Sequence, residues 1–172
     1  MTQDLQKMTQ ASDVLLETLQ KMGISTQTWP HEPVFTVEEA KHLRGTIPGG
    51  HSKNLFLQDR QGQLFLIVAL EDARIDLKQA HLRIGAQGRL SFGPVERLEQ
   101  VWGVKPGSVT PFGAINDVEK LVKVILDAPM MEHASLNFHP LINSRTTTIA
   151  SRDLIRFLEE TGHPPLVTRI SI

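Results

Sequence analysis

The stretch Gly45–Leu57, GTIPGGHSKNLFL, carries residue types and spacings that could do chemistry. Its glycines at 45 and 50 have the spacing of a phosphate-binding loop, G-x-x-x-x-G-K-[ST]. His51 stands where that loop requires lysine, and a lysine arrives only at Lys53. The residues that follow read as a strand, so no helix N-terminus would face a phosphate. The pattern therefore disfavours a nucleoside-triphosphate site.

The same region is basic. Residues 41–53 contain two lysines, one arginine and no acid, which gives a formal charge of +3, with His42 and His51 in addition. Such a segment suits contact with a phosphate backbone. A solvated surface loop has the same composition, and charge alone leaves both interpretations open.

A second candidate segment is GSVTPFG at 107–113. Its glycines would let the backbone approach a ligand closely, and Pro111 would fix a turn. Ser108 lacks the G-x-S-x-G context of a hydrolytic nucleophile. The segment is consistent either with a loop that shapes a ligand pocket or with an ordinary surface turn.

A third candidate is NFHPLINSRTTT at 137–148. It places His139 at the end of a predicted strand, where a histidine can serve as a general base or simply be a satisfied structural residue. Asn143 and three threonines follow. The seven histidines lack metal-ligand spacing and the chain has no cysteine, so we expect neither a metal nor another cofactor.

Composition places these segments in an ordinary globular chain. It has 172 residues, of which 40% are hydrophobic and 22% charged, consistent with a single domain over 1–172. No apolar run approaches the roughly 20 residues of a membrane span, and the polar N-terminus has no signal-peptide core. We therefore expect a soluble cytoplasmic protein. The net charge of −1 means that any contact with nucleic acid needs a local patch.

Hydrophobic periodicity predicts a mixed α/β fold rather than a doubly wound parallel sheet, because helices and strands do not alternate strictly. LFLIVAL is apolar throughout and should be a central strand that pairs with the preceding strand around a turn at Asp59–Gly62. Helices are expected over 12–22, within an N-terminal helical segment 1–23, and over 37–43, 76–84, 94–102 and 151–161, with Asp76 and Ser151 as N-caps. Strands are expected over 24–29, 54–58, 64–70, 89–92, 121–127, 135–139 and 166–172.

Three blocks of this chain together resemble one family. They are HSKNLFLQDRQGQLFLIVALED, RLSFGPVERLEQVWGVKPGSVTPFGAIND and NFHPLINSRTTTIASRDLIRFLEETGH, in that order. The chain is similar to the free-standing aminoacyl-tRNA editing proteins of the YbaK/ProX type over roughly residues 10–170. Within that family it most resembles the bacterial prolyl-tRNA editing proteins, which remove alanine wrongly attached to proline tRNA.

The resemblance implies a mixed α/β domain around a curved, mainly antiparallel sheet with short helices. It implies that Lys53 is the central functional residue and His139 a secondary one. Asn54 would position the substrate, and the G-x-x-x-P loop would shape the amino-acid pocket. The substrate-binding residues expected on this basis are His51, Asn54, Gly107, Ser108, Val109, Thr110, Pro111, Phe112, Gly113 and Asn143.

The implied reaction is hydrolysis of the ester between an amino acid and the 3′ end of tRNA. A lysine ammonium is a compact charge that suits a phosphate, a ribose oxygen or the developing oxyanion. Either His139 or the neighbouring ribose hydroxyl could direct the water. Such editing is useful because a synthetase pocket built for proline excludes a smaller amino acid weakly, at about 1–3 kcal/mol per missing methylene.

Two alternatives remain at this point. The chain could act on a different mischarged tRNA, such as Cys-tRNA(Pro), or it could be a non-catalytic module that binds tRNA or a synthetase. The expected partners are prolyl-tRNA synthetase and the acceptor end of a mischarged tRNA, of which tRNA(Pro) is the favoured one. The chain has no synthetase motifs, so editing would occur in trans.

Overall fold

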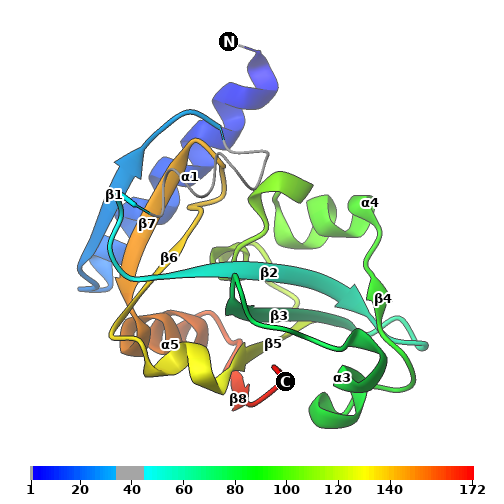
Figure 1. Ribbon diagram of the computed structural model, residues 1–172. Coiled ribbons are helices and arrows are strands. Elements are labelled where there is room, and N and C mark those ends of the chain that lie inside the picture. The colour runs from blue at the N-terminus through cyan, green and yellow to red at the C-terminus, as the bar shows by residue number, and fades with distance from the viewer. Residues whose placement is uncertain (1, 34–44) are drawn as a thin grey trace.

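A computed structural model of the chain describes residues 2–33 and 45–172. Its described strands form one sheet in the order β1-β7-β6-β2-β3-β5-β8, with β4 pairing beside β2 (Figure 1). Four of the pairings are antiparallel and three, β2–β6, β3–β5 and β5–β8, are parallel. The mixed α/β class is confirmed. The strands are β1 Thr26–Pro30, β2 Gly50–Gln58, β3 Leu64–Leu70, β4 Ser91–Phe92, β5 Val122–Asp127, β6 Ser135–Phe138, β7 Arg145–Ala150 and β8 Leu166–Thr168.

Helices cover both faces of this sheet. Each covering helix buries one apolar stripe and leaves its other side polar. None of the described helices is long and apolar enough to cross a membrane. The helices are α1 Gln3–Lys21, α3 Leu77–Ile84, α4 Val95–Arg97, the π-helical turn η1 Leu98–Trp102, the 3₁₀ turns η2 Pro106–Ser108, η3 Pro111–Ile115 and η4 Ala128–Glu132, and α5 Ser151–Glu160.

The predicted hairpin at the centre of the sheet is confirmed. β2 and β3 pair antiparallel from Ser52↔Leu70 to Gln58↔Leu64, around a turn that begins at Asp59. The side chains of β3 are almost entirely buried, as its unbroken apolar sequence predicts.

Two hydrophobic cores lie on opposite faces of the β2–β3 hairpin. Phe56 belongs to the larger core, to which α1 and α5 contribute leucine and phenylalanine side chains. Leu57 belongs to the smaller core, which α3 covers through Ala80 and Ile84. Successive side chains of a strand point to opposite faces, so this alternation fixes which face every residue of β2 presents.

Three local predictions need correction. Helix α1 begins at Gln3 rather than near residue 12, because the Thr2 hydroxyl accepts a hydrogen bond from the Leu5 amide at 3.2 Å and caps it. Ser151 is the first helical residue of α5 and not its cap, since Ala150 occupies the cap position without a side-chain bond. The C-terminal strand covers only Leu166–Thr168 of the predicted 166–172.

The segment after β8 is held by hydrogen bonds to a side chain rather than by strand pairing. The backbone amides of Ile170 and Ser171 donate to Oδ1 of Asp127, at 2.7 and 3.0 Å. A carboxylate at the end of β5 therefore replaces the ladder partners that a longer strand would have had. The helix predicted over 37–43 lies outside the described residues.

Candidate active site

The predicted site residues of β2 lie where this strand passes from one strand partner to another. Gly50 and His51 pair with Leu136 and Asn137 of the parallel strand β6, whereas β2 pairs with β3 from Ser52 onward. The lysine of the site follows immediately after this change of partner. Points where strands change partners commonly open a crevice for a ligand.

Register places Lys53 and His139 on one face of the sheet. His51 lies opposite Asn137 in a parallel pair, so the two side chains share a face. Lys53 lies two residues beyond His51 along β2, and His139 lies two residues beyond Asn137 along the other chain segment. By strand alternation, the two residues that the sequence analysis expected to be catalytic point to the same face of the sheet.

Lys53 is half-buried and tethered. Its Nζ donates a hydrogen bond to the carbonyl oxygen of Ala73, in the turn after β3. No ion pair between described residues includes Lys53. A carbonyl orients the ammonium without neutralising it, so the charge remains available to an anionic or oxyanionic group.

His139 lies directly after β6 and is largely buried. Burial lowers the pKa of this imidazole, and neighbouring His31 lowers it further, against the opposite effect of the Arg145 carbonyl. Its Nδ1 lies 2.9 Å from that carbonyl oxygen, which can only accept, so Nδ1 carries the hydrogen. In the neutral ring Nε2 then holds a free lone pair, which is the state that a general base needs.

His31, which the sequence analysis missed, accompanies His139. The two ring centroids are 6.2 Å apart. His31 Nδ1 donates to the Glu32 carbonyl oxygen at 2.7 Å, and its Nε2 lies 2.8 Å from the hydroxyl of Thr146. Only the fold reveals this pair, because the two histidines come from segments far apart in the chain.

A chain of side-chain hydrogen bonds stabilises the approach to Lys53. Trp29 Nε1 donates to Thr148 Oγ1 at 3.1 Å, and that hydroxyl donates to Asn137 Oδ1 at 2.5 Å. The Asn137 amide in turn donates to the carbonyls of Pro48 and Gly50, at 2.9 and 3.3 Å. The segment that leads into β2 is thereby fixed to β6 and β7.

The glycine at 49 explains why this segment can lie so close to Asn137. Its φ is +100°, and a Cβ there would lie 2.8 Å from Ser135 Oγ and 3.0 Å from Asn137 Nδ2. Only glycine fits both the backbone conformation and the space. Gly50, one of the two glycines that first suggested a phosphate loop, follows directly and pairs with Leu136 of β6. Lys41 and Arg44 of the basic segment lie outside the described residues.

The other predicted residues of β2 have distinct partners. His51 Nε2 donates to the carbonyl oxygen of Ile47 at 2.9 Å. Asn54 lies on the opposite face from Lys53, and its Nδ2 donates to Ser52 Oγ at 3.3 Å. Asn54 Oδ1 is buried and has no hydrogen-bond donor among the described residues. A buried amide oxygen without a donor is costly and is suited to a ligand's hydroxyl or amine.

The segment 107–113 is not the exposed turn that the sequence allowed. The Trp102 indole donates to the Thr110 carbonyl oxygen at 2.6 Å, and the Phe112 amide donates to Thr110 Oγ1 at 3.3 Å. Phe112 is fully buried and meets Phe138 edge to face, with centroids 6.0 Å apart. The segment therefore lies against the residue that precedes His139.

The remaining predicted residues of this segment differ in burial. Gly107 is exposed and Val109 is half-buried, whereas Ser108, Thr110, Pro111 and Gly113 are buried. Asn143 lies half-buried in the turn between β6 and β7. Only the part of the segment near Gly107 and Val109 is thus open to a ligand without rearrangement.

Metal-ligating side chains do not gather in the described part of the chain. Among those residues, no group of three or more histidine, cysteine, aspartate or glutamate side chains could hold a metal ion. The chemistry that these side chains support is that of a tethered cation and a neutral imidazole on one face of the sheet.

Comparison with known proteins agrees with this arrangement. The aminoacyl-tRNA editing domain family matches residues 31–157, a span that includes both Lys53 and His139. The chain belongs to this family. The prolyl-tRNA editing protein ProX of Acetoanaerobium sticklandii is 32% identical over 154 residues, covering 89% of this chain and 93% of that protein.

Two further similarities extend the comparison. The "prolyl-tRNA synthetase associated domain-containing protein 1" of zebrafish, Danio rerio, is 36% identical and covers 89% of this chain and 84% of that protein. A crystal structure described as a putative trans-editing enzyme for prolyl-tRNA synthetase superposes with a TM-score of 0.70 at 18% identity, covering 94% of this chain and 97% of that one. The fold is therefore that of an editing domain.

Proposed function

We propose that this protein is a trans-editing deacylase that hydrolyses the ester of mischarged Ala-tRNA(Pro). The observation that carries the proposal is the placement of Lys53 and His139 on one face, two residues beyond the register pair His51↔Asn137. An unneutralised ammonium and a neutral imidazole on one face of the sheet suit hydrolysis of an ester whose oxygen becomes negative. Membership of the editing family and the ProX relative support this reaction class.

In the proposed reaction, Nε2 of His139 accepts a proton from a water whose oxygen attacks the ester carbonyl carbon. The ammonium of Lys53 stabilises the resulting oxyanion. The bond from carbon to the ribose oxygen then breaks, and the imidazolium returns its proton to that oxygen. The alternative route, in which the neighbouring ribose hydroxyl directs the water, uses Lys53 in the same way and leaves His139 a positioning role.

Selection of the amino acid is proposed to occur beside Gly107–Gly113. The rigid backing of this segment by Trp102 and Phe112 would keep the pocket small. Alanine would then enter, whereas the proline ring would be excluded by steric conflict. His51 and Asn143 are proposed to contact the substrate as well. Asn54 shares its face of β2 with Phe56, whose core includes Phe112, so Asn54 is proposed to contact the substrate from the side of the Gly107–Gly113 segment, opposite to Lys53.

The proposal is tested by measuring hydrolysis of Ala-tRNA(Pro), Pro-tRNA(Pro) and Cys-tRNA(Pro) by the wild-type chain. We expect loss of alanine alone, and a reduction of at least about 100-fold with Lys53→Ala, the size typical of removing one oxyanion donor. Lys123→Ala is the matched control, since Lys123 is an exposed strand lysine on β5. Its rate should equal that of the wild type.

The other outcomes distinguish the alternatives. Hydrolysis of Cys-tRNA(Pro) instead of Ala-tRNA(Pro) would retain the mechanism and change the substrate. Binding of tRNA without hydrolysis of any of the three esters would refute the enzyme and support a binding module. We place the activity in the cytoplasm, in association with prolyl-tRNA synthetase, because that enzyme generates the substrate.

A further inference from the structure

A set of exposed cations, which we call the basic strip, lies on and around helix α3. It consists of five exposed side chains, Arg74, Lys78, Arg83, Arg89 and Arg60. Helix α3 provides Lys78 and Arg83, and the Arg83 guanidinium donates to the Arg169 carbonyl oxygen at 3.3 Å. Arg74 precedes this helix, Arg89 follows it, and Arg60 lies in the turn between β2 and β3. Because α3 buries Ala80 and Ile84 against the sheet, its charged residues face solvent.

The strip begins beside the catalytic lysine. Arg74 directly follows Ala73, whose carbonyl accepts the hydrogen bond from Lys53 Nζ. At its other end, the Arg60 amide donates to the Gln87 carbonyl at 3.0 Å, which brings Arg60 next to the segment that carries Arg89. β2 alone extends roughly 17 Å from Lys53 to Gln58, at ~3.3 Å per residue, so the strip can follow several consecutive phosphates.

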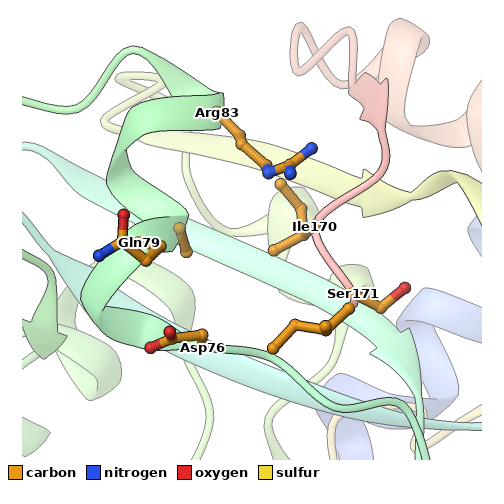
Figure 2. A pocket seen from close by; sticks show the side chains of 7 residues that line it. Asp76, Gln79, Arg83, Ile170 and Ser171 are labelled. Carbon is orange, nitrogen blue, oxygen red and sulfur yellow. The ribbon is translucent and has the colours of Figure 1, made fainter.

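The charges of the strip are not neutralised within the described part of the chain. None of the five side chains takes part in an ion pair there. Three acids lie nearby in the chain. Glu71 is half-buried and has an interaction of its own, Asp72 is exposed, and the Asp76 carboxylate accepts from the Lys78 amide at 3.0 Å as the cap of α3. Figure 2 shows Arg83 and Asp76 at opposite ends of a cavity of about 220 Å³ beneath the helix. Asp76 therefore does not pair with Arg83, which forms no ion pair with a described residue.

We propose that this strip binds the sugar–phosphate backbone of the tRNA acceptor stem while the aminoacyl end reaches Lys53. The inference rests on the proposed function, because a substrate whose ester lies at Lys53 must extend across a neighbouring surface. A chain with a net charge of −1 attracts RNA only where cations are concentrated and unpaired. The strip meets both conditions and lies on the face of the sheet that carries Lys53 and His139.

The test is a triple variant, Lys78→Gln with Arg83→Gln and Arg89→Gln. Its matched control replaces three exposed cations of α1 and α5, which contribute to the core on the opposite face of the sheet: Lys7→Gln with Lys21→Gln and Arg152→Gln. Both variants remove three positive charges, so a difference between them reports position. Circular dichroism and thermal melts establish that both fold.

We expect the strip variant to raise the KM for Ala-tRNA(Pro) at least 10-fold, with kcat affected far less. The slope of log KM against log salt should decrease by up to about 0.9 for each phosphate that the variant no longer neutralises. Equal KM values and equal salt slopes in the strip and control variants would overturn the proposal. If the wild-type chain hydrolyses none of the esters, the proposed function fails, and fluorescence anisotropy with uncharged tRNA(Pro) still tests the strip. Equal affinities of the two variants would then refute it.

Discussion

Nδ1 of His139 donates to the carbonyl oxygen of Arg145 at 2.9 Å, and this bond determines which ring nitrogen is free. Arg145 opens β7, and its guanidinium is held by Asp13 of α1 through an ion pair of 2.7 Å. The acceptor of the histidine is thus a rigid part of the sheet. Because this acceptor is a backbone carbonyl in a strand and not a mobile side chain, it holds the imidazole ring in one orientation. Nε2 therefore points in one fixed direction.

The first prediction concerns the pH dependence of kcat. Because burial lowers the pKa of His139 below its usual 6.5, the imidazole is neutral at pH 7 and can accept a proton. We expect kcat to be level near neutral pH and to fall as pH drops below 6.5 through that lowered pKa. His139→Gln should reduce kcat by about 10²–10⁴-fold and abolish this acidic limb. The measurement is single-turnover deacylation from pH 5 to 8, corrected for spontaneous ester hydrolysis.

One result would show that the substrate, and not His139, directs the attacking water. If His139→Gln retains most of the activity and the same acidic limb, the ribose hydroxyl directs the attack. His31→Gln is the matched control, since that ring lies 6.2 Å from His139 and bonds to Thr146. It should shift the acidic limb slightly upward in pH, because removal of a neighbouring positive charge favours protonation of His139.

A second prediction follows for stability. The unfolded chain binds a proton at His139 more readily than the folded chain, since the folded pKa is the lower one. The stability contribution is therefore complete above about pH 6.5 and is lost as pH falls from there through the lowered folded pKa. Urea denaturation at pH 7.5 and 5.0 should show a smaller acid-induced loss for His139→Gln than for wild type. Equal losses in the two proteins would contradict this account.

A third prediction separates positioning from stability. Thr148→Val removes the donor to Asn137 Oδ1, leaves a buried oxygen unpaired and should cost about 1–3 kcal/mol of unfolding free energy. It also frees the Asn137 amide that holds the segment before Lys53, so we expect kcat to fall 10–100-fold with little change in KM. Thr28→Val is the control because its hydroxyl bonds Thr147 at 2.9 Å on the other face of the same strands.

The Thr28→Val control should lose about as much unfolding free energy as Thr148→Val and keep the wild-type kcat. If both valine variants lose activity in proportion to their stability, the Trp29–Thr148–Asn137 chain has only a structural role. Asn137→Ala provides a second variant at the other end of this chain, and it should reproduce the kcat loss of Thr148→Val.

The sequence predicted the elements of this fold better than their pairing. The β2–β3 hairpin follows from local turn chemistry and an unbroken apolar strand, and the structure has it as expected. The parallel pairs β2–β6, β3–β5 and β5–β8 join segments far apart in the chain, and periodicity contains no information on such partners. The pairing of β2 with β6, which is distant in sequence, also creates the change of strand partner next to Lys53.

The site shows the same limit. Lys53 and His139 were found because short blocks around them resemble a family, whereas His31, Trp29 and Asn137 were not. Their roles depend on hydrogen bonds between strands that only the folded register defines. The segment 107–113 was compatible with an exposed turn because glycine and proline are typical of surfaces. In the structure, the turn is instead held in the interior by the hydrogen bond from the Trp102 indole to the Thr110 carbonyl oxygen.

A fourth prediction tests that buried turn. A Cβ on Gly113 would lie 2.2 Å from Cδ1 and Nε1 of Trp102, whose ring is fully buried and cannot move aside. Gly113→Ala should therefore cost about 1–3 kcal/mol or more and weaken alanine selectivity by displacing the Thr110 carbonyl. Gly62→Ala is the control, since nothing lies within 4 Å and only its φ of +85° is strained. Chemical denaturation and the ratio of alanine to proline hydrolysis measure the two effects.

The last prediction concerns a buried histidine–aspartate pair away from the site. His163 Nε2 lies 2.9 Å from Asp117 Oδ2, and both side chains are nearly inaccessible. Its Nδ1 lies 3.0 Å from the Thr161 carbonyl oxygen. The same carboxylate accepts from the amides of Leu121 and Val122, at 3.0 and 2.9 Å. The pair thus joins the end of α5 to the start of β5.

Asp117→Leu should destabilise the protein by about 3 kcal/mol or more, because it leaves a buried ring N–H and two buried amides without an acceptor, at about 1–3 kcal/mol each. For a chain of this size each kcal/mol lowers Tm by about 2–4 °C, so a large shift is expected. The double variant with His163→Leu should recover part of the loss, since the unpaired ring nitrogen is then absent. Deacylation by the folded fraction should keep the wild-type kcat in both variants. A double variant less stable than Asp117→Leu alone would show that His163 contributes packing rather than hydrogen bonding.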